Sequence, residues 1–261
     1  MILWSHSWAN EVEAVTLKIM YRLHSSAILF VSFLIPSLTS FQALAAPSAA
    51  EIVKQADEHR GLQKSFSTRV RTLVQDGKEK TEQAFQVSVR DADSSLVEQV
   101  SPERARGRKL LMKGLDMWLF TPQVKKPVRI GLQQRLTGDI ANGDISRTNY
   151  AQDYTAKLVG EEGGQHVLDL QAKDKRVTYH RIKYWVEKSG KPVKSEFYAL
   201  NGKLMKTATF SDFKKIDGVE RMTRVTIQDA VVKSRKSILV YSNHKLETFS
   251  DGQFNKEQMD R

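Results

Sequence analysis

The chain has 261 residues, of which 41 are Lys or Arg and 30 are Asp or Glu, so its formal net charge is +11 at pH 7. It contains no cysteine, which excludes disulfides, thiolate metal sites, cysteine nucleophiles and an acylated N-terminal cysteine. The length and composition favour a basic domain that is large enough to bury a sizeable hydrophobic core.

The first element expected along the chain is a secretory signal peptide. Arg22 and His24 precede an apolar run at residues 27–38, and Ala43 and Ala45 supply the small residues of a cleavage site. Because a helix that spans a bilayer needs about 20 apolar residues, an uncleaved membrane anchor is the weaker alternative.

Cleavage after this segment leaves residues 46–261 as the working protein. We expect residues 1–45 to be a signal peptide with an N-terminal extension, and the true start to be Met20. We expect residues 46–261 to form a single domain in the periplasm, although this length also allows two small domains.

A helix is predicted over residues 49–60. Ser48 and Glu51 are spaced as a capping box, in which the serine side chain accepts from a backbone N–H and the glutamate reaches back to the cap. Gly61 predicts the end of the helix. The apolar residues that follow the cap on one helix face are Ile52, Val53 and Ala56.

Beyond residue 65 the apolar residues recur with a period of two, which indicates β-strands. Turn signals that contain glycine separate the runs, at residues 76–77, 163–164, 189–190, 201–202 and 217–218. The gaps are too short for crossover helices, so we expect consecutive strands to pair antiparallel. The apolar face of these strands is expected to carry Phe66, Val70, Phe85, Val87, Ile182, Tyr184, Val186, Phe197 and Phe210.

Residues 132–154 break this pattern, because they are polar and too long for a hairpin loop. We expect one or two short helices that cross the sheet and move as a lid, with Gly138 and Gly143 as hinges. An ordered surface loop is the alternative. The residues expected to face inward, of which the first three are four apart and would form one helical stripe, are Leu132, Leu136, Ile140 and Ile145.

No catalytic or metal-binding motif is evident. The sequence lacks a nucleophile elbow, a phosphate loop and a dinucleotide fingerprint, and no pair of carboxylates stands out as acid and base. We therefore expect no enzymatic activity, no metal and no cofactor. The histidines beyond residue 45, none of them spaced as a zinc ligand pair, are His59, His166, His180 and His244.

The positive charge gathers at residues 104–108, 125–129 and 173–183. Bases with interleaved aromatic residues indicate nucleic-acid binding in some proteins, but an exported protein meets little nucleic acid, so we expect no nucleic-acid partner. An anionic membrane surface is the nearer partner. For each cluster, a solvated face that keeps the protein soluble is the alternative.

One apolar, aromatic stretch, GLDMWLFTP at residues 114–122, has no chemistry attached to it. It resembles the periplasmic carriers of the outer-membrane lipoprotein-sorting (LolA-like) family, in which a turn glycine leads into an apolar, aromatic strand that ends near a proline. The resemblance continues at residues 128–130, 143–145, 150 and 157–161, and the N-terminal helix also suits it.

The resemblance implies a mainly β fold, an unclosed antiparallel β-barrel with an N-terminal helix and a short helical lid over an apolar concave face. Acyl chains of lipoproteins or other lipids would bind between the sheet and the lid. In the strand that carries the resemblance, the lining would come from Trp118 and Phe120 or from their alternating neighbours Met117 and Leu119. Each of these four residues also suits an ordinary core position.

The function that the resemblance implies is transfer of acyl chains toward the outer membrane, with an inner-membrane transporter or exporter as partner. A sensor or adaptor protein of the same fold, associated with a membrane exporter, is the alternative, and an enzyme acting on the cell envelope ranks third. The better-known carriers latch the lid with an arginine that precedes a proline. The nearest position here is Arg90, which Asp91 follows, so the latch does not transfer directly.

Overall fold

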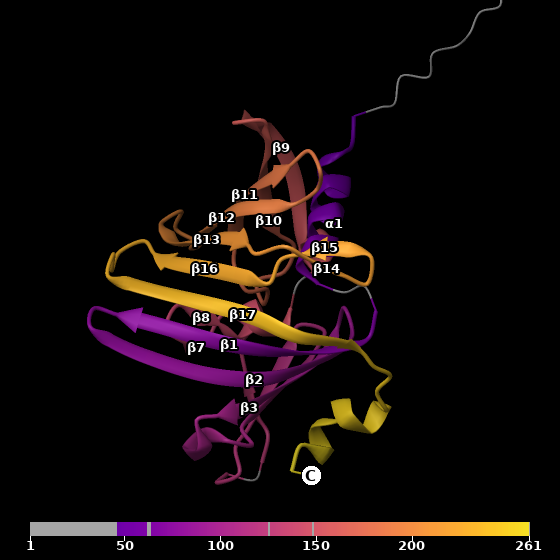
Figure 1. The fold of residues 1–261 in the computed structure, drawn as a ribbon, viewed down its shortest axis with the longest axis vertical. Helices are drawn as coiled ribbons and strands as arrows, with labels where there is room; N and C mark the ends of the chain where they lie inside the picture. Colours follow the sequence, from indigo (N-terminus) through magenta and orange to yellow (C-terminus); the bar gives the residue numbers. More distant parts are fainter. Residues whose placement is uncertain (1–45, 62–63, 125, 148, 261) are drawn as a thin grey trace, which may run out of the picture. The chain divides into compact units, whose positions relative to one another are not determined.

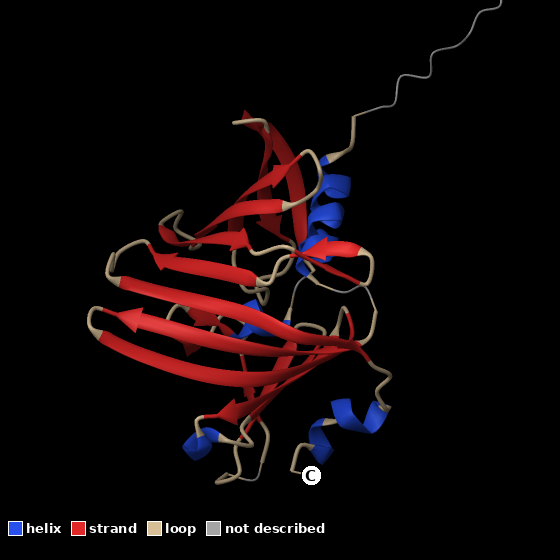
Figure 2. Ribbon diagram, in the orientation of Figure 1, coloured by secondary structure: helices blue, strands red, loops and turns tan. Residues whose placement is uncertain are grey.

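The structure is a computed structural model that describes residues 46–61, 64–124, 126–147 and 149–260 (Figure 1). The predicted signal peptide, residues 1–45, lies outside the described residues. Strands make up most of the described chain, and helices are few and short (Figure 2). None of the described helices is long and apolar enough to cross a membrane.

Helix α1 (Ala49–Arg60) matches the capping-box prediction at both ends. The Glu51 carboxylate accepts the Ser48 N–H at 2.7 Å, and the Ser48 hydroxyl accepts the Glu51 N–H at 3.3 Å. The helix ends where the Gly61 N–H donates to the Asp57 carbonyl at 3.0 Å. The side chains that this helix buries in the main core are Ile52, Val53 and Ala56.

A single antiparallel sheet of 13 strands organises the rest of the fold. In spatial order its strands are β6 (Val128–Ile130), β5 (Asp116–Phe120), β4 (Lys109–Lys113), β3 (Ser94–Ser101), β2 (Glu79–Asp91), β1 (Phe66–Asp76), β17 (Arg235–Leu246), β16 (Arg224–Asp229), β13 (Leu204–Ser211), β12 (Pro192–Tyr198), β11 (Arg181–Glu187), β10 (Gln165–Ala172) and β9 (Tyr154–Glu162).

The sheet curves strongly but does not close (Figure 1). Within the described residues, its edge strands β6 and β9 pair with one neighbour each and not with each other. A small separate hairpin consists of β14 (Lys214–Ile216) and β15 (Val219–Arg221) and lies beside α1 (Figure 1). The predicted mainly β, unclosed antiparallel architecture is therefore confirmed.

All five predicted glycine-containing turns are hairpin turns in the structure. They join β1 to β2, β9 to β10, β11 to β12, β12 to β13 and β14 to β15. The register places Val70 opposite Phe85 and Ile182 opposite Phe197. These four side chains enter the same buried cluster as the apolar face of α1, so the predicted apolar side of the sheet is the side that α1 covers.

The insertion at residues 132–153 packs across this apolar side. The prediction of one or two short helices is confirmed, since two are present. The predicted helical stripe through Leu132, Leu136 and Ile140 is wrong, because a hairpin occupies the first half of the segment. The elements of the insertion are β7 (Arg135–Thr137), β8 (Ile140–Ala141), α2 (Asn142–Ser146) and α3 (Tyr150–Asp153).

The hairpin of the insertion touches the sheet at Gly138. Its φ is +52°, and a Cβ atom there would lie 2.5 Å from Ser237 Oγ and 2.7 Å from Val74 Cγ1. The neighbouring Asp139 N–H donates to Ser237 Oγ at 3.1 Å. Glycine is therefore required at this position for close packing on β1 and β17. A hinge role for Gly138 and Gly143 stays a prediction.

The other side of β4 and β5 is covered by two C-terminal turns, η2 (Asp251–Phe254) and η3 (Lys256–Gln258). Phe120 forms a separate buried cluster there, and Trp118 packs against it. Side chains alternate along a strand, so Met117 and Leu119 face the insertion and the main core. Of the two alternatives for this strand, the structure therefore excludes Trp118 and Phe120 from the inner side and places Met117 and Leu119 there.

Candidate functional site

A cavity of about 210 Å³ lies where the C-terminal end of α1 approaches β1, β2, β17 and α2. Its lining is partly apolar and partly charged. The apolar side chains are Phe66, Val87, Val89, Ala92 and Ile145. The ionisable groups, besides Tyr241, are Asp57, Arg60, Lys64, Arg90, Asp91, Arg221 and His244.

A second pocket, of about 20 Å³, continues the interior on the other side of Arg60. Arg60 and Tyr241 line both spaces, so Arg60 lies at the boundary between a charged mouth and a mostly apolar interior, in which Asp144 is the other charged residue of the lining. The apolar side chains that line the inner pocket are Phe197, Ala208, Phe210, Met222, Val225, Ile227 and Leu239.

The Arg60 side chain is only 6% exposed. Its guanidinium carbon lies 3.6 Å from the centre of the Tyr150 ring and 5.8 Å from that of Phe210. Its Nη1 donates to Asp57 Oδ1 at 3.2 Å, while its buried Nε has no partner within the described residues. One N–H of this buried cation therefore stays unsatisfied within the described residues.

Arg221 is a second buried arginine at the cavity, with the residue 5% exposed. Its Nη1 donates to the carbonyls of Glu58 and Gly61, and its Nε donates to the Ile216 carbonyl at 3.3 Å. It forms no ion pair with any described carboxylate, and burial lowers its pKa. Burial and the nearby Arg221 charge also lower the pKa of His244, which keeps that imidazole neutral near pH 7.

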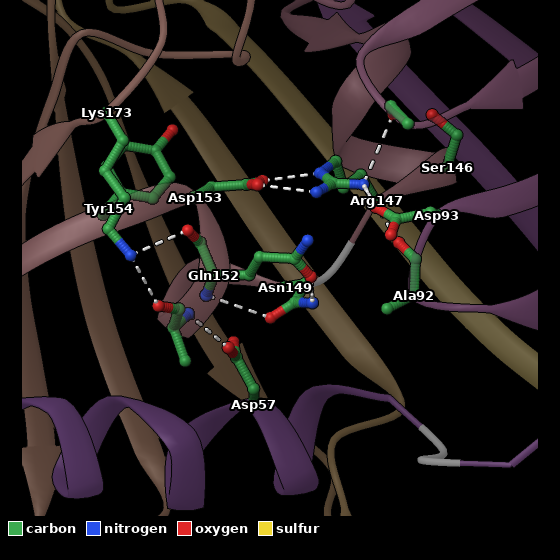
Figure 3. Close-up of polar contacts among 12 residues, drawn as sticks. Asp57, Ala92, Asp93, Ser146, Arg147, Asn149, Gln152, Asp153, Tyr154 and Lys173 are labelled. Carbon is green, nitrogen blue, oxygen red and sulfur yellow. Dashed lines mark hydrogen bonds and ion pairs between the residues drawn. The ribbon is translucent and has the colours of Figure 1, made fainter.

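Asp57 connects α1 to the insertion. Its Oδ2 accepts the Ala151 N–H of α3 at 2.8 Å, and Figure 3 shows its carboxylate reaching from α1 toward that helix. Burial raises the pKa of Asp57 to about 7, although Arg60 acts in the opposite direction. The joint between α1 and α3 therefore contains a group that titrates near neutral pH.

Arg147 anchors the insertion to the hairpin turns of the sheet (Figure 3). Its Nε and Nη2 donate to the two carboxylate oxygens of Asp153 at 2.6 Å each. Its Nη1 donates at 3.0 Å both to the Ala92 carbonyl and to Asp93 Oδ1, and at 3.4 Å to the Gly114 carbonyl. An arginine thus holds the insertion down, but it belongs to the insertion itself. Arg90 instead pairs with Asp91 and Asp251.

Asp144 fixes α2 to the opposite half of the sheet. Its Oδ2 accepts from Lys206 Nζ on β13 at 2.9 Å, and its Oδ1 accepts from the Tyr179 hydroxyl at 2.6 Å. Both side chains of the Asp144–Lys206 pair are nearly buried. The insertion is therefore held by charged groups at both ends and by apolar side chains between them.

The structure brings part of the predicted lining together around the two spaces. Phe66 and Val87 line the outer cavity, as does Ile145 of the predicted lid. Phe197 and Phe210 line the inner pocket. The predicted residues that are buried in the same core without lining either space are Val70, Phe85, Ile140, Ile182, Tyr184 and Val186.

The remaining predicted residues lie elsewhere in the interior. Leu132 packs with Met112 and Met117 beyond the cavity. Leu119 and Leu136 pack at the margin of the main core. None of these residues, nor Trp118 or Phe120, lines the cavity or the inner pocket.

The polar groups of the site were not predicted from the sequence. Arg60 follows Val53 and Ala56 at helical spacing, so its place on the buried face of α1 was readable from the sequence. Arg221 and His244 lie in strands that give no such signal, and only the fold brings them to the end of α1. Within the described residues, no group of three or more His, Asp or Glu side chains could hold a metal ion.

The chain resembles known proteins in sequence and in fold. The model of a family described as an uncharacterized protein matches residues 91–261. No protein with a curated description matches the chain. Among solved structures, the LolA superfamily protein from Nitrosomonas europaea is 37% identical, with a TM-score of 0.77. That alignment covers 80% of this chain and 98% of the other.

Two more distant structures share the fold. An outer membrane lipoprotein-sorting protein domain from Vibrio parahaemolyticus is 21% identical with a TM-score of 0.71, over 82% of this chain and 98% of that one. A DUF1329 family protein from Desulfovibrio piger is 23% identical with a TM-score of 0.69, over 79% and 95%. At these identities the likeness concerns the fold only.

Proposed function

The chain belongs to the LolA superfamily, and from this premise we propose that it is a periplasmic carrier that binds acyl chains of lipoproteins or other lipids for transfer toward the outer membrane. The fold is that of a carrier or binding protein. The observation that carries the proposal is the apolar side of an unclosed sheet, which is covered by a separate insertion and not by the sheet itself.

The energetics of such binding suit reversible transfer. Burial of 10 to 14 methylenes contributes roughly 8 to 11 kcal/mol at about 0.8 kcal/mol each. Association costs about 4 to 15 kcal/mol in lost freedom. The two terms nearly balance, so a lipid would be held in water and still released to a partner.

Binding of an acyl chain would require the insertion to move. The cavity of about 210 Å³ is smaller than the roughly 300 to 1,000 Å³ of pockets that enclose small ligands. The inner pocket adds only about 20 Å³. In the proposed cycle the insertion, including Ile140 and Ile145, lifts from the sheet and the acyl chain takes the place of these side chains.

The proposal includes partners. Residues 1–45 would direct export, an inner-membrane transporter or exporter would load the domain at residues 46–261, and its basic surface would approach anionic headgroups. Each Lys or Arg near such a surface contributes about 1 kcal/mol. Catalysis forms no part of the proposal.

A reversible crosslink tests the proposed movement. Ser95 Oγ on β3 donates to the Ser146 carbonyl of α2 at 2.9 Å, and the chain has no cysteine. In the variant Ser95→Cys/Ser146→Cys, oxidation should stop uptake of a fluorescent fatty-acyl probe, and a reducing agent should restore it.

The single variant Ser95→Cys, treated with the same oxidant, is the matched control and should take up the probe throughout. Mass spectrometry under non-reducing conditions reports whether the crosslink has formed. Full uptake by the crosslinked protein would contradict the lid, and failure of the uncrosslinked protein to bind any acyl probe would contradict the carrier.

A further inference from the structure

The charges around the outer cavity do not balance. Asp57 pairs with Arg60 at 3.2 Å, and Asp91 pairs with Arg90 at 2.9 Å. The remaining basic side chain at the mouth, Lys64, pairs with Asp217 at 2.9 Å. Each carboxylate that lines the cavity is thus already matched by a cation.

Arg221 forms no ion pair with a described carboxylate, since Asp217 and Glu58, which act to raise its pKa, lie beyond ion-pair distance. Its bonds to three backbone carbonyls use Nε and Nη1, so Nη2 has no protein partner in this part of the chain. A buried cation that is held only by carbonyls stays underpaired, because a carbonyl carries no net charge. An anion in the cavity would supply the missing charge.

Arg60 adds a second guanidinium at the boundary of the same space. Its Nε is buried without a partner, and an unsatisfied buried donor costs about 1 to 3 kcal/mol. The Nη1 atom and the guanidinium face are occupied by Asp57 and Tyr150, which fixes the orientation of the group. The Arg60 guanidinium is therefore held in a fixed position at the boundary of the cavity.

We propose that this cavity binds the anionic head group, a phosphate or a carboxylate, of an amphiphile whose hydrocarbon chain extends past Arg60 into the apolar interior. Arg221 and Arg60, which both line the cavity, supply the positive charge. This inference rests on the proposed carrier function and gives its cargo a chemical class.

The order of the two spaces determines the direction of the ligand. Arg60 and Tyr241 line both of them. On one side lie the groups that recognise an anion. On the other lie mostly apolar side chains that include Phe197 and Phe210, together with the carboxylate of Asp144, which Lys206 neutralises at 2.9 Å. A head group at the mouth therefore places the hydrocarbon chain where the insertion would open.

Calorimetric titration of the full-length protein with ligands of one chain length tests the inference. The ligands are dodecyl phosphate, the neutral ester monododecanoylglycerol, and inorganic phosphate alone, each below its aggregation concentration. Hydrogen bonds to charged groups contribute about 1.5 to 3 kcal/mol. We therefore expect dodecyl phosphate to bind about tenfold more tightly or better than the neutral ester, and inorganic phosphate to bind far more weakly.

The variant His244→Glu places a negative charge in the cavity without removing either arginine, so it should abolish the preference for dodecyl phosphate over the neutral ester, which is read as the ratio of the two affinities. The control Ser242→Glu adds the same charge at an exposed position two residues away and should keep the preference. Arg221→Lys, which retains the charge, should keep part of it.

Each other outcome has a defined meaning. Equal affinity for both amphiphiles would overturn the head-group site. A preference for dodecyl phosphate that survives His244→Glu would also overturn it. Either result would leave the proposed carrier function unaffected. Inorganic phosphate that binds as tightly as dodecyl phosphate would identify a site for free anions and overturn the inference. If neither amphiphile binds, the proposed function fails together with it.

Discussion

The guanidinium carbon of Arg60 lies 3.6 Å from the centre of the Tyr150 ring, so the last turn of α1 is stacked on the first turn of α3. Asp57 strengthens this joint by accepting the Ala151 N–H at 2.8 Å. The N-terminal helix and the insertion are thus one connected cover over the apolar side of the sheet.

Replacement of Tyr150 by leucine should weaken this joint. A desolvated cation–π contact contributes about 2 kcal/mol, and the ring also packs edge-on against Tyr154 and Tyr184. We expect Tyr150→Leu to lower the free energy of unfolding by about 2 to 4 kcal/mol. Tyr150→Phe keeps the ring and should cost less than about 1 kcal/mol. Urea denaturation measures both free energies of unfolding. Equal losses in Tyr150→Leu and Tyr150→Phe would show that the aromatic ring does not stabilise the joint.

Asp57 should make stability depend on pH. The unfolded state releases this proton near the ordinary pKa of 3.8, whereas the folded state keeps it up to about pH 7. The folded state therefore binds more protons between these values, so the free energy of unfolding falls as pH rises from about 4 to about 7.

In Asp57→Asn this fall should be reduced, because the titrating group is gone. Denaturation at several pH values across that window measures the slope. Glu79→Gln, at an exposed carboxyl at the start of β2, is the control and should keep the slope of the wild type. An unchanged slope in Asp57→Asn would rule out Asp57 as its source.

Gly138→Ala should be strongly destabilising. The added methyl would meet Ser237 Oγ and Val74 at 2.5 and 2.7 Å, and the residue has φ +52°. At Gly202 the φ is +77° but nothing lies within 4 Å of an added Cβ. Gly202→Ala should therefore cost only the backbone strain, about 1 to 2 kcal/mol, and Gly138→Ala clearly more. Similar melting temperatures for the two variants would show that the insertion is not packed tightly on β1 and β17.

Arg147→Lys should loosen the insertion without unfolding the sheet. Lysine cannot reproduce the two-pronged pair with Asp153 together with the bonds to Ala92 and Asp93. Hydrogen exchange at residues 142–153 should accelerate about tenfold, which corresponds to about 1.4 kcal/mol, while β1 and β2 keep their protection. The control Arg129→Lys alters an exposed pair with Asp116 and should change neither region. Faster exchange throughout the sheet would mean that Arg147 supports the whole fold.

Much of the architecture could be predicted because its causes are local. The capping box at Ser48 and Glu51 defines α1, and the glycine turns define the hairpins, since each depends on a few neighbouring residues. Alternation then identified which residues of β1 and β2 face the core.

The insertion could not be read in this way. The four-residue spacing of Leu132, Leu136 and Ile140 resembles a helical stripe, but these side chains enter different clusters, and tertiary contacts select a hairpin. Alternation in β5 likewise defined two faces without showing which one the C-terminal turns cover, so the sequence left both faces open as the inner one.

The candidate site was the least predictable part. Arg60 and Arg221 are 161 residues apart, and their shared cavity depends on how α1 packs beside the β14–β15 hairpin. No periodicity relates them. Arginine is mostly found at protein surfaces. Residue type alone therefore predicts exposed positions for Arg60 and Arg221.

In the proposed function, the covered apolar side of the sheet holds an acyl chain. Mass spectrometry of the organic extract of the full-length gene product, expressed in a bacterium and purified from the periplasm without detergent, tests it most directly. We expect the extract to contain an acyl-chain compound at about one molecule per protein chain. The Ser95→Cys/Ser146→Cys variant, stripped of lipid, oxidised and then exposed to lipid again, should not regain this compound. An extract without any acyl compound, from a protein that also fails to take up added lipid, would contradict the proposed function.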